Sequence, residues 1–108
     1  ALSGLIFVLT RQGNFERAHT RINEAIRQNA GRNETVSALH YLKADVFKAQ
    51  ENPAAAEEEL NRAIAADENY LPAYTALASL LVGRNQIDAA VAQYKKLLQK
   101  KPSSPVFT

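Results

Sequence analysis

The chain has 108 residues, of which 46% are hydrophobic and 22% are charged, so it has enough apolar side chains to fold around a core. It contains no cysteine, which excludes disulfides and thiolate chemistry, and the apolar run 5–9 is too short to cross a bilayer. The net charge is only +2, but it is unevenly distributed. Residues 1–36 and 71–108 are basic, whereas residues 37–70 contain three basic and seven acidic side chains. This pattern is typical of solvated outer faces, and it would also favour attraction between neighbouring segments.

Two helices are predicted at the start of the chain. Apolar residues recur at three- and four-residue steps, first at Leu2, Leu5, Ile6 and Leu9 and then at Phe15, Ala18, Ile22 and Ala25. Between them, Gly13 is suited to a left-handed helix end and Asn14 to the N-cap of the second helix. The two helices are expected to form an antiparallel hairpin. A four-residue extension, 30–33, follows it, and Asn33 is expected to cap the next helix.

A second pair of helices is predicted over residues 34–49 and 53–66. Asn52 followed by Pro53 is a strong helix start, because proline is favoured at the first helical position. Glu58 and Arg62 are four residues apart and are expected to pair on the outer face of the second helix.

A third pair of helices is predicted over residues 71–104, with its connection at residues 83–86. Apolar residues recur at helical spacing before the connection, at Ala73, Leu77, Leu80 and Leu81, and after it, at Ile87, Ala90, Val91, Tyr94, Leu97 and Leu98. Asn85 is expected to be the N-cap of the second helix, with Asp88 three residues on, and Pro102 is expected to end that helix.

The third pair resembles a tetratricopeptide repeat. Its residues Tyr74-x2-Leu77-Ala78-x2-Leu81, Ala90-x3-Tyr94 and Pro102 follow the family pattern W-x2-L-G-x2-Y, A-x3-F and P, with side chains of similar size class. The pattern recurs, because stepping back 34 and then 38 residues from Ala90 reaches Ala56 and Ala18. The resemblance covers nearly the whole chain. It implies an all-α fold, a right-handed superhelical stack of three antiparallel helix hairpins over about 1–32, 33–70 and 71–104.

We expect residues 1–108 to be a single repeat domain and a fragment of a longer protein, with 105–108 the start of a further helix. Two residues depart from the family pattern. Ile6 replaces a small residue, so the first hairpin is expected to be splayed, or relaxed at this site because the chain is cut there. In the second hairpin, His40-x2-Lys43-Ala44-x2-Phe47 fits the pattern except at Lys43, which replaces a leucine. A neighbouring stripe is expected to take over the packing of that helix: Leu39, Leu42 and Val46.

No constellation of residues points to catalysis. His40 is at a packing position and is interpreted as a half-buried structural ring, whereas His19 is on a polar helix face and is expected to be solvated. Neither has a histidine or a carboxylate four residues on, so no metal site is predicted, and the four glycines form no phosphate-binding loop. The adjacent residues 57–59 are all glutamate and cannot converge on one point from a helix. We therefore predict that this chain is not an enzyme and binds no cofactor or metal.

Nucleic acid and membranes are not expected as partners of this chain. Arginines make the first hairpin basic and lysines make the end of the third basic, but the acidic middle interrupts any continuous track for phosphates. Weak self-association is expected through the apolar ends of the array, at Tyr94, Leu97 and Leu98 or at the face formed by 2–9. Val106 and Phe107 belong to the expected start of a further helix.

The resemblance implies a groove that binds a protein segment. In tetratricopeptide proteins, the first helix of each hairpin lines a concave groove that holds extended or helical peptides. Matched to the motif, the groove residues here are Phe7, Thr10 and Arg11, then Tyr41, Asp45 and Lys48, then Thr75, Ser79 and Val82, with Ser3 and Ala38 beside them. One subgroup of the family clamps acidic chaperone tails with lysine and asparagine on this face. Its clamp is absent here, where the matching residues are Ser3, Phe7, Leu42, Pro72 and Ala76.

The sequence thus predicts a non-catalytic scaffold for protein–protein interaction. Its alanine-rich second hairpin resembles tetratricopeptide proteins of bacterial envelope and exopolysaccharide systems. Two alternatives stay open: a purely structural spacer whose groove is empty, and a module attached to an enzyme whose chemistry lies outside this chain. A bacterial cytoplasm and a periplasm are both compatible with the sequence.

Overall fold

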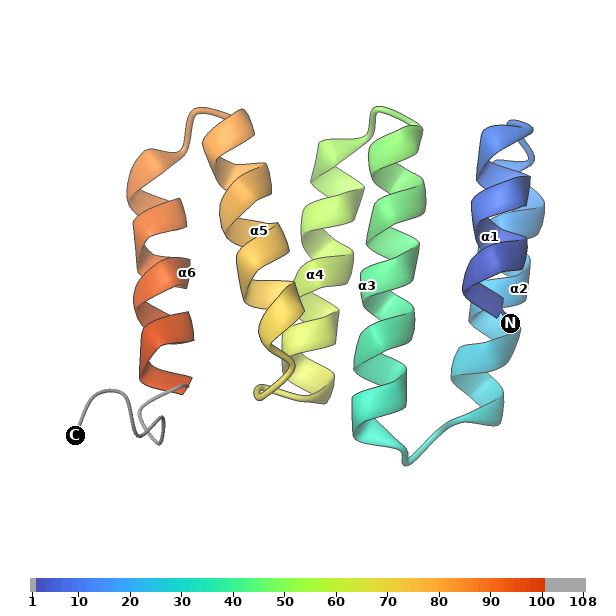
Figure 1. Cartoon of the computed structure of the whole chain (residues 1–108), viewed down its shortest axis with the longest axis horizontal. Coiled ribbons are helices and arrows are strands. Elements are labelled where there is room, and N and C mark those ends of the chain that lie inside the picture. Colours follow the sequence, from blue (N-terminus) through green and yellow to red (C-terminus); the bar gives the residue numbers. More distant parts are fainter. Residues whose placement is uncertain (1, 101–108) are drawn as a thin grey trace.

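The computed structural model describes residues 2–100, apart from the side chains of Leu97 and Lys100 (Figure 1). Over these residues the chain forms six α-helices and no strand. The helices are α1 (Leu2–Arg11), α2 (Phe15–Gln28), α3 (Asn33–Ala49), α4 (Pro53–Ala66), α5 (Leu71–Gly83) and α6 (Ile87–Lys100). The predicted all-α stack of helix hairpins is confirmed. The predicted helix end at Pro102 and the apolar residues Val106 and Phe107 lie outside the described residues.

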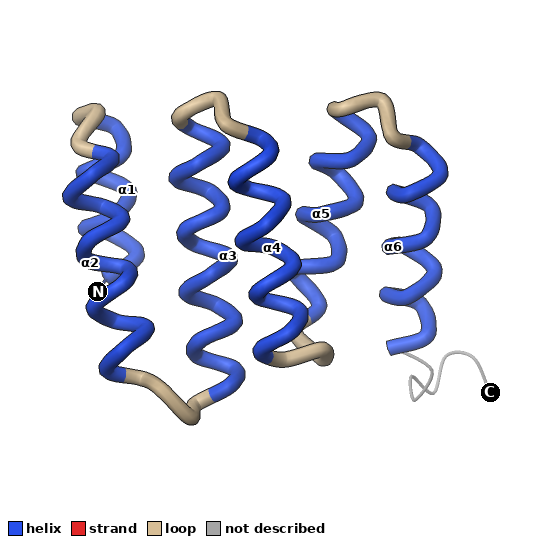
Figure 2. Tube along the Cα trace, turned by 180° about the vertical axis from the view of Figure 1, so that it is seen from behind, coloured by secondary structure: helices blue, strands red, loops and turns tan. Residues whose placement is uncertain are grey.

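The helices run up and down in one row, each packed against the next in the chain, and α1 also contacts α3. Figures 1 and 2 show α1 and α2 together at one end of the row and α6 at the other. The row measures 46 × 33 × 20 Å. An array of this kind has no single central core, so each hairpin is stabilised by its own helices and by its neighbours.

The turn inside each hairpin has the same backbone conformation. Gly13, Glu51 and Asn85 have left-handed φ angles of 79°, 59° and 65°. In each turn the next residue donates a backbone hydrogen bond to the preceding helix: Asn14 N to Leu9 O (2.8 Å), Asn52 N to Phe47 O (2.9 Å) and Gln86 N to Leu81 O (2.8 Å). This bond is the signature of a Schellman helix end. The prediction that Asn85 caps α6 is therefore wrong, because Asn85 ends α5 instead.

The predicted helix starts are confirmed in part. The Asn52 side chain accepts a hydrogen bond from Ala55 N at 3.4 Å, and Pro53 is the first residue of α4. Asn14 is at the N-cap of α2, but its side chain makes no capping hydrogen bond. Asn33 is the first residue of α3, and Arg32 takes the N-cap position that was predicted for Asn33.

The apolar side chains form two clusters along the row. One joins α1, α2 and α3 around Ile6, Leu9, Ala18, Ile22, Leu39 and Val46. The other joins α3, α4, α5 and α6 around Ala44, Ala56, Leu60, Leu77, Ala78, Leu81 and Ala90. Ala18, Ala56 and Ala90 are almost fully buried, which confirms that small residues are placed where the two helices of each hairpin meet.

The first hairpin is looser than the other two. Ile6, at the position of Ala44 in α3 and Ala78 in α5, is 2% exposed and fills the space that those alanines leave to the partner helix. Accordingly, α1 and α2 approach each other over a much shorter stretch than α3 and α4 do. Helix α1 is also shorter than α3, with 10 residues against 17, so the splaying that Ile6 was expected to cause stays a prediction.

Candidate protein-binding groove

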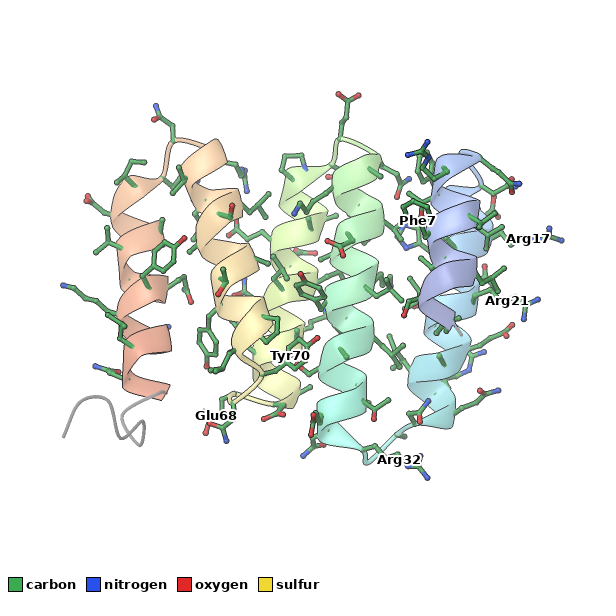
Figure 3. The ribbon with its side chains drawn as sticks, in the orientation of Figure 1. Phe7, Arg17, Arg21, Arg32, Glu68 and Tyr70 are labelled. Atoms are coloured by element: carbon green, nitrogen blue, oxygen red, sulfur yellow. The ribbon has the colours of Figure 1, made fainter. Side chains whose placement is uncertain are left out.

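A groove runs between α1 and α3. At one point along it is a cavity of about 390 Å³ lined by Ser3, Ile6, Phe7, Thr10, Leu42, Asp45 and Val46. Ile6 and Val46 are buried and form an apolar floor, whereas Phe7 is 63% exposed. Figure 3 shows Phe7 on the side of α1 that faces α3. The groove therefore has an apolar floor with an aromatic ring on one rim and the Asp45 carboxyl on the other.

A second cavity continues the groove toward the end of α3 where the helix begins. It also measures about 390 Å³ and is lined by Leu2, Ser3, Thr35, Ala38, Leu39, Tyr41, Leu42 and Tyr70. The two cavities share Ser3 and Leu42, so they form one continuous channel, which we call the α1/α3 groove. Its far end is closed by Tyr41 and Tyr70, whose rings meet edge to face with centroids 6.0 Å apart.

The structure brings only part of the predicted binding set together. Phe7, Thr10 and Asp45 line the first cavity, and Tyr41 lines the second. The guanidinium of Arg11 lies over the Phe7 ring, 5.7 Å from its centroid.

The remaining predicted residues lie away from the α1/α3 groove. Lys48 and Ser79 line a smaller cavity of about 270 Å³ between α3, α4 and α5. Thr75 and Val82 are exposed on α5 and line none of these three cavities.

Two of the predicted residues have other contacts that limit their use in binding. The Thr10 hydroxyl donates a hydrogen bond to Ile6 O at 2.7 Å, so its proton is already engaged within α1. Tyr41 is half-buried and packs against the apolar cluster that joins α3 to α6. Tyr41 therefore contributes to the core as well as lining the groove. Removing its ring would cost stability as well as any binding, so Phe7 is the cleaner probe of the groove.

Two residues that the sequence did not assign to the groove also line it. Leu42 was assigned to helix packing, but it also lines both cavities. Tyr70 was missed because it precedes α5 as its N-cap residue, outside any helical stripe. Its ring position depends on the path of the connection between α4 and α5, which no periodic pattern records.

The Asp45 carboxyl contributes a negative charge to the lining of the α1/α3 groove. Partial burial raises the pKa of the Asp45 carboxyl above its usual range, and the nearby charge of Lys48 offsets only part of this shift. Burial and the Asp45 carboxylate together raise the pKa of Tyr41. A cationic group bound in the groove would favour the ionised form of Asp45, so this carboxyl is suited to accept a charged partner.

A buried polar cluster lies inside the second hairpin. Glu59 is 2% exposed, and its carboxylate accepts a hydrogen bond from His40 Nδ1 at 2.8 Å. Arg62 Nη1 donates to the other carboxylate oxygen, and Lys43 Nζ is 3.8 Å from it. Burial alone would raise the pKa of Glu59, but the His40 hydrogen bond and the neighbouring cations outweigh burial and lower the pKa.

This cluster explains the departure from the family pattern in α3. Lys43, which replaces a leucine, faces Glu59 together with His40, so the two polar residues of α3 have one shared partner. The interpretation of His40 as a half-buried structural ring is confirmed. The predicted pair of Glu58 with Arg62 is wrong, because Arg62 binds Glu59 across a three-residue step.

The prediction that His19 is solvated is also wrong. Its ring is half-buried and packs against Phe47 of α3, with ring centroids 4.3 Å apart. His19 Nε2 donates to the Gln50 side-chain oxygen at 2.7 Å. His19 is therefore part of the contact between the first and second hairpins.

The described residues 2–100 offer no group of three or more acidic or histidine side chains that could hold a metal ion. Within the same part of the chain, no helix has the length and apolar character that crossing a membrane requires.

Comparison with known proteins agrees with the geometry. Two family models, both described as tetratricopeptide repeat, match residues 8–70 and 47–107. Among curated proteins, none matches the sequence closely enough to count as a relative. Each family match spans more than half of the chain, and the two overlap over residues 47–70, which include α4. The chain therefore belongs to the tetratricopeptide repeat family, whose repeats generally mediate contacts between proteins.

Proposed function

We propose that this chain is a non-catalytic scaffold that binds a segment of another protein in the α1/α3 groove. The observation that supports this most strongly is the pair of adjoining cavities of about 390 Å³ each, which share Ser3 and Leu42. A channel with two cavities of this size can take two side chains from one segment. The buried floor would supply apolar contact, and the exposed rims would fix the direction of the segment.

Phe7 is the aromatic residue best placed to contribute binding energy. It is the most exposed large apolar side chain on α1, and rigid aromatic rings dominate the energetics of many protein interfaces. Asp45 on the opposite rim and Arg11 beside Phe7 would set the charge pattern that a ligand must match. Thr75, Ser79 and Val82 would extend the contact along α5, with Lys48 between them and the groove.

The sequence of α4 suggests which class of partner to test first. The alanine-rich sequence of α4 makes proteins of a bacterial envelope or exopolysaccharide system the first partners to test. We infer that the protein works by holding such a partner in place and not by chemistry of its own, which agrees with the usual role of this family.

The proposal can be tested without knowing the partner. Short random peptides displayed on phage are selected against the immobilised chain, and one selected peptide is synthesised and titrated against the chain in solution. Phe7→Ala should weaken its binding about tenfold or more while the melting temperature stays unchanged, because the ring is mostly exposed. Tyr94→Ala is the matched control, since Tyr94 is an exposed aromatic residue on α6, far from the groove.

Nuclear magnetic resonance shifts would locate the peptide. Shifts confined to α1 and α3 would support the proposal. Equal affinity for the wild-type chain and Phe7→Ala, or shifts confined to another surface, would overturn it and favour a structural spacer with an empty groove.

A further inference from the structure

The second cavity of the α1/α3 groove contains two aromatic rings whose polar ends are not engaged within the described part of the chain. Tyr41 and Tyr70 are half-buried, with ring centroids 6.0 Å apart. No described residue forms a hydrogen bond with either hydroxyl, whereas the Tyr74 hydroxyl donates to Glu68 O at 2.7 Å. Figure 3 shows Tyr70 on the opposite side of α3 from Phe7. A segment that contacts both Phe7 and Tyr70 therefore crosses the face of α3.

The charged side chains that act on these two rings are acidic. Burial raises the pKa of Tyr41, and the Asp45 carboxylate raises it further. Burial also raises the pKa of Tyr70, and Tyr41, Asp45 and Glu34 add to this shift. Both carboxylates are thus within electrostatic reach of the tyrosine pair. A positive charge placed at the rings is attracted by the two carboxylates and by the negative faces of the rings.

The position of Asp45 has no explanation within α3 itself. Asp45 is near the C-terminal end of the helix, where the helix dipole disfavours a carboxylate, and its carboxyl is partly buried. Within residues 2–100 no side chain forms a hydrogen bond or a salt bridge with it, and the charge of Lys48 offsets burial only in part. Glu34, by contrast, is in the first turn of α3, where the dipole favours an acid. Asp45 is therefore the groove carboxyl that an external cation would stabilise most.

Basic side chains lie at the other end of the groove. Arg11 is the last residue of α1, with its guanidinium over the Phe7 ring, and Lys48 is in the last turn of α3. Helices α1 and α3 run in the same direction (Figure 1), so these two cations are at the same end. At the opposite end, Glu34 and Tyr70 line a further cavity of about 370 Å³. A cationic ligand group is therefore repelled from the Phe7 end and attracted to the Tyr70 end.

The spacing of the two cavities suits one extended segment. Residues of α3 between 42 and 46 line the first cavity, and residues between 35 and 42 line the second. The two centres are about five residues apart along α3, which corresponds to ~8 Å. Side chains two residues apart in an extended segment are ~7 Å apart and point to the same side. One segment can thus place two such side chains in the two cavities.

We propose that the segment bound in the α1/α3 groove has an arginine or lysine in the second cavity, two residues from an apolar side chain in the first. This inference rests on the proposed function, because it describes the ligand of the same groove. The stem of the basic side chain lies on Leu39, and its charged head lies against Tyr41 and Tyr70, within reach of Asp45. The apolar side chain packs on the buried floor of the first cavity.

Selection of displayed peptides tests the class of ligand. The random library is selected in parallel against the wild-type chain, Asp45→Lys and Glu58→Lys. Glu58 is an exposed acid on α4 that lines none of the groove cavities, so Glu58→Lys is the control for net charge. Peptides selected on the wild type and on Glu58→Lys should contain arginine or lysine two residues from an apolar residue. Peptides selected on Asp45→Lys should lack this pattern, and its absence from the wild-type selection would overturn the inference.

A comparison of two peptides measures the contribution of the basic residue. One selected peptide and a copy with leucine in place of the basic residue are titrated against each chain. On the wild type the leucine copy should bind about tenfold more weakly. Asp45→Asn should bring the two affinities within about threefold of each other, whereas Glu58→Gln should leave the tenfold ratio unchanged. Tyr70→Leu should also reduce the ratio, because leucine keeps the apolar contact but lacks the ring and the hydroxyl.

The ratio of the two affinities separates binding from stability, because both peptides meet the same folded chain. Circular dichroism melts confirm that each variant is folded at the temperature of the titration. A ratio that Asp45→Asn leaves at its wild-type value would overturn the inference. Selected peptides that depend on Phe7 but bind equally well with leucine would overturn it while the proposed groove function stands. Nuclear magnetic resonance shifts confined to a surface other than α1 and α3 would overturn both.

Discussion

At matching positions between their two helices, the second hairpin has charged and polar side chains, whereas the third has mainly apolar ones. Where the second has His40, Lys43 and Glu59, the third has Tyr74, Leu77 and Gln93 at matching positions. Tyr74 and Leu77 are each 2% exposed and pack as apolar side chains, whereas the second hairpin encloses a carboxylate with three cationic or hydrogen-bonding partners. The comparison shows that this crossing accepts a charged residue only when its partners are present with it, because an unpaired buried charge is costly.

The largest effect is expected from removing the shared partner in the second hairpin. Glu59→Ala should lower the free energy of unfolding by about 3 kcal/mol, because it leaves His40 and Lys43 facing a site without their carboxylate. Gln93→Ala, at the matching position in the third hairpin, should cost well under about 1 kcal/mol, because the Gln93 oxygen has no hydrogen-bond partner among the described residues. Urea denaturation measures both. Similar losses for the two variants would contradict the comparison.

A smaller loss of stability is expected from enlarging the alanine at the helix crossing, a position where the second and third hairpins both have a small residue. Ala90→Leu should lower the free energy of unfolding by about 2 kcal/mol, because Ala90 is 1% exposed between α5 and α6 and a larger side chain would force them apart. Ala89→Leu is the control, since Ala89 is exposed on the same helix. Thermal melts of the two variants would differ by several degrees. Equal melting temperatures would show that α5 and α6 do not cross at Ala90.

At the turn inside each hairpin, exchanging residue types between the first and second hairpins should change stability in opposite directions. Glu51 adopts a left-handed φ of 59° at the position where the first hairpin has Gly13. Glu51→Gly should therefore stabilise the chain by about 0.5–1 kcal/mol, since glycine adopts this conformation without a steric penalty. Gly13→Ala should destabilise it by about as much, because Gly13 has a φ of 79° and the added methyl group would meet nothing else within 4 Å. Two changes of the same sign in chemical denaturation would count against this account.

The smallest loss of stability is expected from lowering the pH into the mildly acidic range. The pKa of Glu59 is lowered in the folded chain, so the stability that its ionised form contributes is fully present above the usual glutamate range. It is lost as the pH falls below about 4.3 and through the lowered pKa. A triple variant with the third hairpin's residues, His40→Tyr, Lys43→Leu and Glu59→Gln, lacks this carboxylate and should lose less stability over the same range. Parallel acid dependence of the two proteins would indicate that other carboxyl groups account for it.

Much of the fold could be predicted from the sequence because local signals and repeat spacing agree. Apolar periodicity placed the helices, the Asn52–Pro53 pair marked the start of α4, and the alanines at 18, 56 and 90 marked the helix crossings. These features depend on residues close together in the sequence or on a repeat of fixed length, and both can be read from one sequence. Of the binding residues assigned by the repeat pattern, only some line the α1/α3 groove.

The predictions that failed depend on contacts between distant residues. The position of His19 is decided by Phe47 and Gln50 in the next hairpin, which helical periodicity within α2 does not reveal. Arg62 could reach Glu58 or Glu59 along its own helix, and the cations of α3 select Glu59. Asn85 was assigned to the wrong helix because asparagine is common both at N-caps and at left-handed helix ends. Residue type alone does not distinguish those two uses.

The looseness around Ile6 has a consequence for folding cooperativity. In a linear array each hairpin opens at a cost set by its own contacts and those of its neighbours, so the hairpin with the least extensive helix crossing opens first. Fraying should therefore begin at α1 while α3 to α6 remain folded. Because α1 forms one wall of the α1/α3 groove, a segment bound there has to hold α1 in place. Part of its binding energy would then be spent on ordering α1, and the bound ligand would act as the final structural element of the first hairpin.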